Sequence, residues 1–265
     1  MRKIVFLILI YFSLVFNLSS ENICENIDIP WLLNHAPFPE NAEIISKKDV
    51  FGLCELIVLI NTEPMSLYCG KDFFISGQML KDKEVITLKT IETLADKINK
   101  RKKEFEEKEK SEENQRILFF KQNNDKLKEF TAFEFGAKNP DKTIFVITDP
   151  KCFHCKQLLI WLEKVSVEDK IKVNTILYPV MGDESKDMAA RAVCNDFGIS
   201  EYLGMEDDSK PYICEKSDSL FMSQEDFFKN ADLNFIPYIV DSNFKWSVEG
   251  ADLEVLKEKL KNCSN

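Results

Sequence analysis

The sequence is short of basic residues and of the residues that dominate low-complexity chains. It has 35 lysine and arginine residues against 45 aspartate and glutamate residues, so its formal net charge is −10. No basic stripe with interleaved aromatic residues occurs, and an acidic chain is repelled by nucleic acid and by anionic lipid. We therefore expect no nucleic-acid partner. Only 8 Gly and 9 Pro occur in 265 residues, which excludes a low-complexity chain.

Long apolar runs are also scarce, and the only one lies at the N-terminus. Arg2 and Lys3 precede an apolar run over 4–18, and the small residues Ser19 and Ser20 follow it. This pattern predicts a secretory signal peptide over 1–20, whose removal would leave a net charge of −12. The alternative is an uncleaved membrane anchor, for which about 15 apolar residues are few against the ~20 needed to span a bilayer.

Cysteine, in contrast, is plentiful. In an exported protein, cysteines are expected in disulfides rather than as buried thiols. Eight cysteines allow 105 pairings in principle, so their spacing has to reduce the choice. The cysteines are Cys24, Cys54, Cys69, Cys152, Cys155, Cys194, Cys214 and Cys263.

An N-terminal domain is predicted over 21–86. Residues 24–49 are interrupted by prolines and are expected to be irregular. Strand-like segments at 51–60, 65–69 and 73–76, separated by turn residues, predict an antiparallel meander. A turn centred on residues 61–62 places Cys54 opposite Cys69 on neighbouring strands. We therefore expect a disulfide between these two cysteines.

A charged segment over 87–127 is predicted to separate two domains. Apolar residues at helical spacing begin near Thr87, and from residue 99 to residue 116 only Phe105 is large and apolar. Opposite charges recur four residues apart there, as in Lys100/Glu104, a spacing that stabilises helices. A helix that is polar all round typically bridges domains through solvent. The alternative is a disordered charged linker.

The C-terminal domain, over 128–265, alternates between strand and helix patterns. Segments 130–135, 143–148, 171–178 and 235–240 are strand-like, whereas 155–165 and 185–195 are helical. Asp252 is expected to cap a last helix that ends near Leu260. This order predicts an α/β sandwich.

Cys152 and Cys155 form a Cys-Phe-His-Cys motif between a predicted strand and the start of a helix. Free backbone N–H groups and the helix dipole at such a position stabilise a thiolate, and cysteines in this setting have pKa values of roughly 3.5–7.5. Cys152 is therefore predicted to be the nucleophile and Cys155 the resolving thiol, while His154 adds a positive charge or a hydrogen bond. No cofactor beyond this redox-active pair is expected.

The motif has two alternative interpretations, a structural disulfide and half of a zinc site. Structural zinc needs four ligands. However, no second close cysteine pair exists, and His35 and His154 are the only histidines. We therefore expect no metal, and we favour redox chemistry.

Residues outside the motif complete the predicted site. Pro237 interrupts an apolar strand, and a cis Ile236–Pro237 bond near the reactive sulfur would expose the backbone of Ile236 to an extended substrate. Cys194 and Cys214 are expected to form a structural disulfide around a charged, helix-poor segment. Cys24 and Cys263 could pair with each other, join subunits or stay free.

Several of these segments together resemble the bacterial periplasmic disulfide isomerases DsbC and DsbG, and the resemblance covers nearly all of the mature chain. It implies a small α+β, cystatin-like dimerisation domain, a long linker helix and a thioredoxin-like fold with a helical insertion. It also implies a V-shaped periplasmic homodimer that acts on misfolded disulfide-containing exported proteins and is kept reduced by a DsbD-like membrane reductase. Cys152 would be the nucleophile, Cys155 the resolving cysteine and Pro237 the cis-proline. The segments are Phe73–Gln78, the charged linker, Thr143–Cys152, the helix Ala189–Cys194, the Cys194/Cys214 pair and the strand with Pro237.

The sequence departs from that family at defined positions. Phe153-His154 replaces the usual Gly-Tyr or Pro-Tyr, and a histidine before the second cysteine resembles the dithiol oxidase DsbA. Ile236 replaces the usual threonine, and Cys54 and Cys69 are additional. We predict a thiol:disulfide interchange protein of the isomerase or reductase type. A DsbA-like oxidase is the alternative within this chemistry, and a holdase chaperone or metal-handling module is the alternative outside it.

Overall fold

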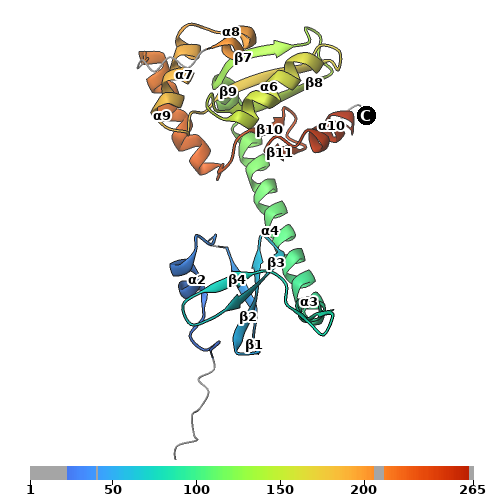
Figure 1. Cartoon of the computed structure of the whole chain (residues 1–265). Coiled ribbons are helices and arrows are strands. Elements are labelled where there is room, and N and C mark those ends of the chain that lie inside the picture. Colours follow the sequence, from blue (N-terminus) through green and yellow to red (C-terminus); the bar gives the residue numbers. More distant parts are fainter. Residues whose placement is uncertain (1–22, 40, 206–211, 263–265) are drawn as a thin grey trace, which may run out of the picture. The chain divides into compact units, whose positions relative to one another are not determined.

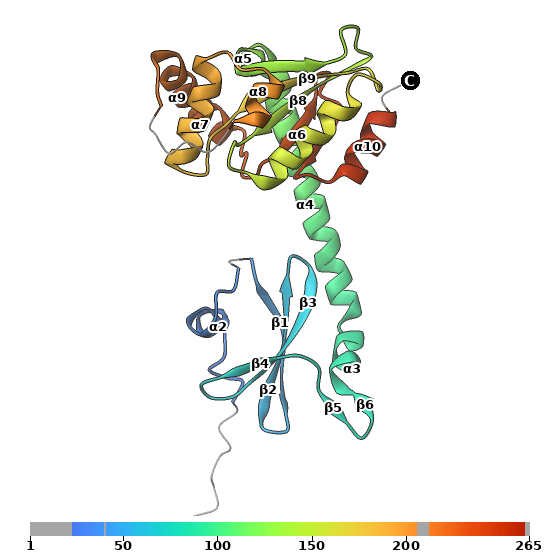
Figure 2. The same ribbon diagram turned by 45° about the horizontal axis from the view of Figure 1, so that its top comes forward.

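The computed structural model describes residues 23–39, 41–205 and 212–262; the predicted signal peptide and Cys263 lie outside them. The chain forms two compact units, one ending at Lys108 and the other beginning at Glu109 (Figures 1 and 2). This division falls inside helix α4 (Ala95–Gln122). The division also lies within the charged segment predicted over 87–127, and we describe each unit separately.

The first unit is built on an antiparallel sheet with the strand order β1-β2-β3-β4. The predicted meander is present, and its register is confirmed, because Ile60 pairs with Glu63 and Cys54 pairs with Cys69. The expectation that 24–49 is irregular was wrong, since this segment contains helix α2 and strand β1. Pro30 lies within the first turn of α2, where a proline costs no intrahelical hydrogen bond. The elements are α2 (Ile29–His35), β1 (Glu43–Val50), β2 (Leu53–Ile60), β3 (Glu63–Cys69) and β4 (Phe74–Ser76).

Side chains alternate between the two faces of this sheet, as the pleat of a strand requires. On one face, Leu56 and Leu67 pack against Leu32 of helix α2. On the other face, Ile57 and Leu59 pack with Ile98 of α4. The N-terminal segment therefore covers one face of the sheet, and the helices that follow the sheet cover the other.

The expected Cys54–Cys69 disulfide is not the one in the structure. Cys24 is bonded to Cys54 instead, with their Cα atoms 5.0 Å apart, and Cys69 is a buried free thiol. The register was predicted correctly, but the sequence offered no sign that the segment before α2 folds back onto this face. Cys24 therefore reaches Cys54 from outside the sheet.

The predicted charged helix is present, but it is interrupted once. The hairpin of β5 (Leu80–Lys81) and β6 (Glu84–Val85) leads into α3 (Ile86–Thr93), which is followed by α4. Two of the expected ion pairs with four-residue spacing are present, Lys100–Glu104 and Lys103–Glu107, both at 3.8 Å. Such exposed pairs contribute little individually. The last turns of α4 differ from the rest, because Arg116 and Phe120 are buried in the second unit.

The second unit contains a five-stranded sheet with the order β11-β10-β8-β9-β7. Strands β8 and β9 are parallel and are joined by helix α6, while β10 runs antiparallel to β8. This strand order and connection confirm the thioredoxin-like α/β fold, with β7 as an added edge strand. The strands are β7 (Thr131–Gly136), β8 (Lys142–Thr148), β9 (Ile171–Leu177), β10 (Tyr238–Asp241) and β11 (Ser247–Glu249).

Both faces of this sheet are covered by helices, so β8 is buried throughout most of its length. Ile144 and Val146 point to one face, where α6 and α10 pack. Phe145 and Ile147 point to the other face, where the end of α4, α5 and α9 pack. The helices of this unit are α5 (Asn124–Glu129), α6 (Phe153–Val165), α7 (Asp183–Cys194), α8 (Ile199–Gly204), α9 (Glu215–Asn230) and α10 (Leu253–Asn262).

Three local predictions have clear outcomes. Asp252 caps α10 as expected, because its Oδ1 accepts the N–H groups of Glu254 and Val255 at 3.0 Å. Pro237 precedes β10 rather than interrupting it, so β10 can pair on both sides. The segment between Cys194 and Cys214, expected to be poor in helix, contains α8.

Candidate active site

Cys152 and Cys155 lie where β8 ends and α6 begins, as the sequence predicts. Cys152 is the N-cap residue of α6, and its Sγ accepts the backbone N–H of Cys155 at 3.2 Å. The first-turn N–H groups of a helix have no intrahelical acceptor, and this sulfur acts as the acceptor for one of them. Partial positive charge at the helix N-terminus favours a negative sulfur at the same position.

The two thiols differ in exposure. Both are free, but Cys152 is 8% exposed whereas Cys155 is fully buried. Burial, followed by its hydrogen bond with Cys152, raises the pKa of the Cys155 thiol far above its ordinary value. Cys155 therefore remains protonated at neutral pH, and only Cys152 is accessible to a reagent or a substrate sulfur.

Asp149 braces the loop that leads to Cys152. This buried carboxylate accepts the N–H of Lys151 on Oδ1 at 2.7 Å, and on Oδ2 the N–H groups of Val180 at 2.7 Å and Met181 at 3.0 Å. Its backbone carbonyl also accepts the N–H of Cys152 at 3.1 Å. One residue thus joins the loop of the reactive cysteine to the loop after β9. Sequence analysis did not single it out, although an acidic residue directly after a buried strand was a usable signal.

Replacing Asp149 by asparagine is expected to loosen both loops. An amide keeps one acceptor oxygen, so at least one of these three part-buried N–H groups loses its partner, at a cost of about 1 kcal/mol. Urea unfolding should show this loss of stability, and the amides of Val180 and Met181 should exchange hydrogen faster. The control is Asp125→Asn, since the side chain of Asp125 is 97% exposed and its loss should change stability by less than about 0.5 kcal/mol. Equal stability of the two variants would contradict the bracing role.

Pro237 lies at the same end of the strands as the reactive pair. Tyr238 pairs with Ile147, so the residue before it lies beside the end of β8, from which the chain continues to Cys152. The Ile236–Pro237 bond is cis, as the sequence analysis expected. The carbonyl of Pro237 accepts the N–H of Gly250 at 2.8 Å. The backbone of Ile236 has no such partner within the described part of the chain.

Arg116 holds the segment that carries the cis-proline. Its guanidinium is buried and donates to the carbonyl oxygen of Asp232 from Nε at 3.2 Å and from Nη2 at 2.9 Å. It also forms an ion pair with Glu249 and lies against the rings of Phe235 and Tyr238. Sequence analysis missed this residue because it occurs at the end of a charged stretch.

The residues between the two cysteines point outward. Phe153 is 69% exposed, and its ring meets that of His154 edge-on, with centroids 5.7 Å apart. His154 is also exposed. Among the residues that the structure describes, no hydrogen bond joins its imidazole to Cys152. Its predicted contribution to the chemistry therefore stays a prediction.

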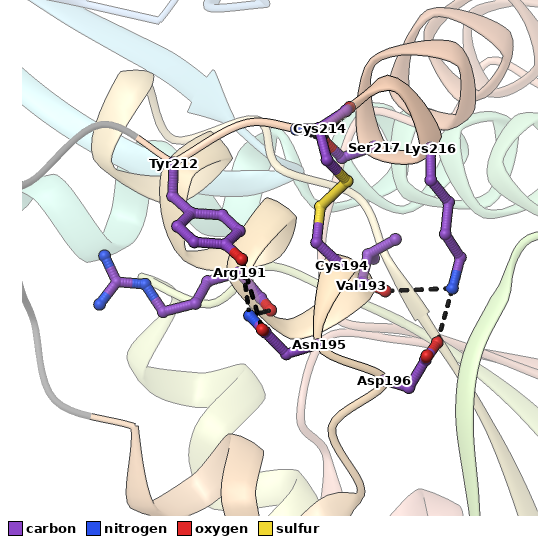
Figure 3. The surroundings of a disulfide bond; sticks show 9 residues. All are labelled: Arg191, Val193, Cys194, Asn195, Asp196, Tyr212, Cys214, Lys216 and Ser217. Atoms are coloured by element: carbon purple, nitrogen blue, oxygen red, sulfur yellow. Dashed lines mark hydrogen bonds and ion pairs between the residues drawn. A yellow bond between two sulfur atoms is a disulfide. The ribbon is translucent and has the colours of Figure 1, made fainter.

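Cys194 and Cys214 form a disulfide that joins the end of α7 to the start of α9 (Figure 3). This is the pairing expected from the sequence. Lys216 reinforces the same junction, because its Nζ donates to the carbonyl of Val193 at 3.1 Å and to Asp196 Oδ1 at 2.6 Å. The disulfide thus fixes the helical insertion rather than taking part in the reactive site.

No family model matches the chain, and no curated protein matches it. Solved structures with a partial likeness include a linker-deletion mutant of Proteus mirabilis ScsC, at 16% identity and a TM-score of 0.46, covering 70% of this chain and 98% of that one. Wolbachia pipientis alpha-DsbA2, a thiol-disulfide exchange protein, has 18% identity and a TM-score of 0.46 over 58% of this chain and 98% of that one. Helicobacter pylori DsbG has 14% identity and a TM-score of 0.37 over 76% and 93%.

Proposed function

We propose that this chain is an exported thiol:disulfide interchange protein that reduces or isomerises wrong disulfides in exported proteins. The observation that carries the proposal is the Cys152/Cys155 pair at the N-terminus of α6. Cys152 keeps some exposed surface and its sulfur accepts a helix N–H, whereas Cys155 is fully buried and protonated. An accessible nucleophile next to a shielded thiol is the arrangement that exchange through a mixed disulfide requires.

The reaction is a pair of sulfur displacements. The Cys152 thiolate attacks one sulfur of a substrate disulfide; the substrate S–S bond breaks, and its electron pair leaves on the other sulfur, which takes a proton. A second substrate thiolate can then displace Cys152, which rearranges the substrate without net oxidation. Alternatively, Cys155 loses its proton and attacks Cys152, which releases reduced substrate and leaves a Cys152–Cys155 disulfide. Because the raised pKa of Cys155 slows its attack on Cys152, the mixed disulfide has time to rearrange.

The loops around the cysteines suit an unfolded polypeptide. Four large apolar side chains are exposed at the start of α6 and on the neighbouring loops: Phe153 at 69%, Val180 at 50%, Met181 at 55% and Phe235 at 42%. Unfolded segments expose the apolar residues that such a surface would cover. The unpaired backbone of Ile236 supplies donor and acceptor groups for an extended strand.

The proposal includes a cellular setting. No helix within the described residues is long and apolar enough to cross a membrane. We propose export to the periplasm through the predicted signal peptide, a homodimer formed by the N-terminal units, and reduction of the Cys152–Cys155 disulfide by a DsbD-like membrane reductase. Light scattering of the mature protein tests the dimer, and thiol trapping from living cells tests whether the pair is kept reduced.

The decisive experiment follows the refolding of a scrambled protein with several disulfides. Reduced protein, added in catalytic amount, should speed recovery of native pairings. The same protein should be slower at oxidising a fully reduced substrate. The opposite order of the two rates would contradict isomerase or reductase activity.

His154 supports a second candidate, a DsbA-like dithiol oxidase, because an exposed histidine inside the motif can stabilise an adjacent thiolate once it is protonated. A stabilised reduced form makes the disulfide a stronger oxidant. A reduction potential near ~−120 mV would favour the oxidase. Suppression of aggregation that survives the loss of both Cys152 and Cys155 would instead favour a holdase chaperone.

A further inference from the structure

Three cysteines of the first unit meet on one face of its sheet. Cys24, Cys54 and Cys69 belong to the same buried apolar cluster, together with Leu32 of α2. All three are buried: Cys54 and Cys69 have no exposed surface, and Cys24 is 6% exposed. The reactive pair of the second unit is separate from this cluster and takes no part in the argument that follows.

The Cys69 thiol lies directly across the ladder from the disulfide. Cys54 and Cys69 are register partners on antiparallel strands, so their side chains point to the same face. Residues opposed in this way have Cα atoms about 4.5–5.5 Å apart, and disulfides need about 4.4–6.8 Å. Cys54 can therefore bond either to Cys24, as in the structure, or to Cys69, with little movement of the backbone.

We propose that the first unit contains a second thiol–disulfide exchange site, in which Cys69 displaces Cys24 from Cys54. The Cys69 thiolate attacks Sγ of Cys54; the bond between Cys24 and Cys54 breaks, and its electron pair leaves on Cys24, which takes up a proton. The product contains a Cys54–Cys69 disulfide and a Cys24 thiol. No oxidant or reductant is needed, because one disulfide replaces another.

The exchange changes whether the N-terminal segment is covalently attached to the sheet. In the structure, the Cys24–Cys54 bond anchors the segment that leads into α2 across one face. In the exchanged form, the Cys54–Cys69 bond cross-links β2 to β3. The segment that leads into α2 is then held only by packing contacts such as those of Leu32. The two forms therefore differ in whether the N-terminal segment is covalently attached.

Burial sets the rate of this exchange. Burial alone raises the pKa of the Cys69 thiol to about 11, so the thiolate is scarce at neutral pH. Its population, and with it the exchange rate, should rise tenfold for each pH unit up to about pH 10. The ionisable side chains that share this face of the sheet are exposed: Lys47 and Asp49 on β1, Glu63 on β3, and Glu25, Asp28 and His35 on the N-terminal segment, while β4 has none. The buried Glu55 and Tyr68 lie on the opposite face.

The test uses the full chain carrying Cys152→Ser, Cys155→Ser and Cys263→Ser, so that no other free thiol can act. The protein is incubated at pH 7 to 10, quenched in acid, unfolded and alkylated, and its disulfide-linked peptides are identified by mass spectrometry. Cys69 should be the labelled cysteine at the start. Cys24 labelling and a Cys54–Cys69 peptide should then appear about tenfold faster per pH unit, while near-UV circular dichroism remains native.

Two further variants make the outcome decisive. Adding Cys69→Ser should abolish the labelling of Cys24, and Cys24→Ser should form Cys54–Cys69 on oxidation. The proposal is overturned if Cys24–Cys54 is the only disulfide of this unit at every pH. It is also overturned if Cys24 is still labelled in Cys69→Ser, or if exchange occurs only once the native signal is lost.

Discussion

Replacing Cys152 by serine should lower the rate of disulfide exchange by roughly 1000-fold or more, because a hydroxyl at the same position is a far weaker nucleophile than a thiolate. Cys152 is the only member of the pair with any exposed surface to present to a substrate. The rate is measured as recovery of a scrambled multi-disulfide protein. Circular dichroism should show the fold unchanged, since serine can still accept the N–H of Cys155.

Two matched variants separate this effect from a general loss of thiols. In Cys155→Ser, Cys152 can still attack the substrate, but the intramolecular attack by residue 155 that releases the substrate is lost. A mixed disulfide with the substrate should therefore accumulate and should be visible on a non-reducing gel. In Cys263→Ser, a cysteine outside the reactive motif is removed, and the exchange rate should stay within about twofold. Equal rates for Cys152→Ser and the wild type would refute the catalytic role of residue 152.

The reactive motif could be predicted because its chemistry depends on local features. A buried strand, a Cys-x-x-Cys motif and an amphipathic helix are contiguous in the sequence, so the N-cap position of Cys152 follows from their order. The pairing of Cys54 with Cys69 could also be predicted from neighbouring residues, because the position of the turn between two strands determines which of their residues are paired.

The parts that could not be predicted depend on contacts between distant segments. The predicted disulfide partner of Cys54 was wrong because Cys24, 30 residues away in the sequence, bonds to it instead. The prolines in the intervening segment had indicated an irregular structure. Asp149 binds N–H groups some 31 residues further along the chain, and the sequence gives no sign of where that loop lies. Helix α9 was missed from the residues, although the resemblance implied a helical insertion.

Arg116 is the clearest case of a residue whose role only the folded chain reveals, and its replacement should have the largest effect on stability. Arg116→Ala leaves the carbonyl oxygen of Asp232 without its donors and the carboxylate of Glu249 without its cation. Leaving the carbonyl of Asp232 without a donor costs about 1–3 kcal/mol, and the ion pair adds less because the side chain of Glu249 is 41% exposed, so we expect a loss of roughly 2–3 kcal/mol in urea unfolding. The control is Arg101→Ala in the same helix, whose ion pairs with Glu43 and Glu104 are exposed and are worth less than about 1 kcal/mol.

The effect of Arg116→Ala should also depend on pH, with a sign that tests its cause. Burial raises the pKa of Glu249, and the charge of Arg116 opposes this rise. Without Arg116 the pKa of Glu249 should rise further, so the folded variant is disfavoured once this carboxyl ionises. The loss of stability relative to the wild type should therefore be smaller below pH 4.5, where Glu249 is protonated, and should grow as the pH rises to 7. A loss that is the same at both pH values would mean that Arg116 acts through the carbonyl of Asp232 and its ring contacts rather than through Glu249.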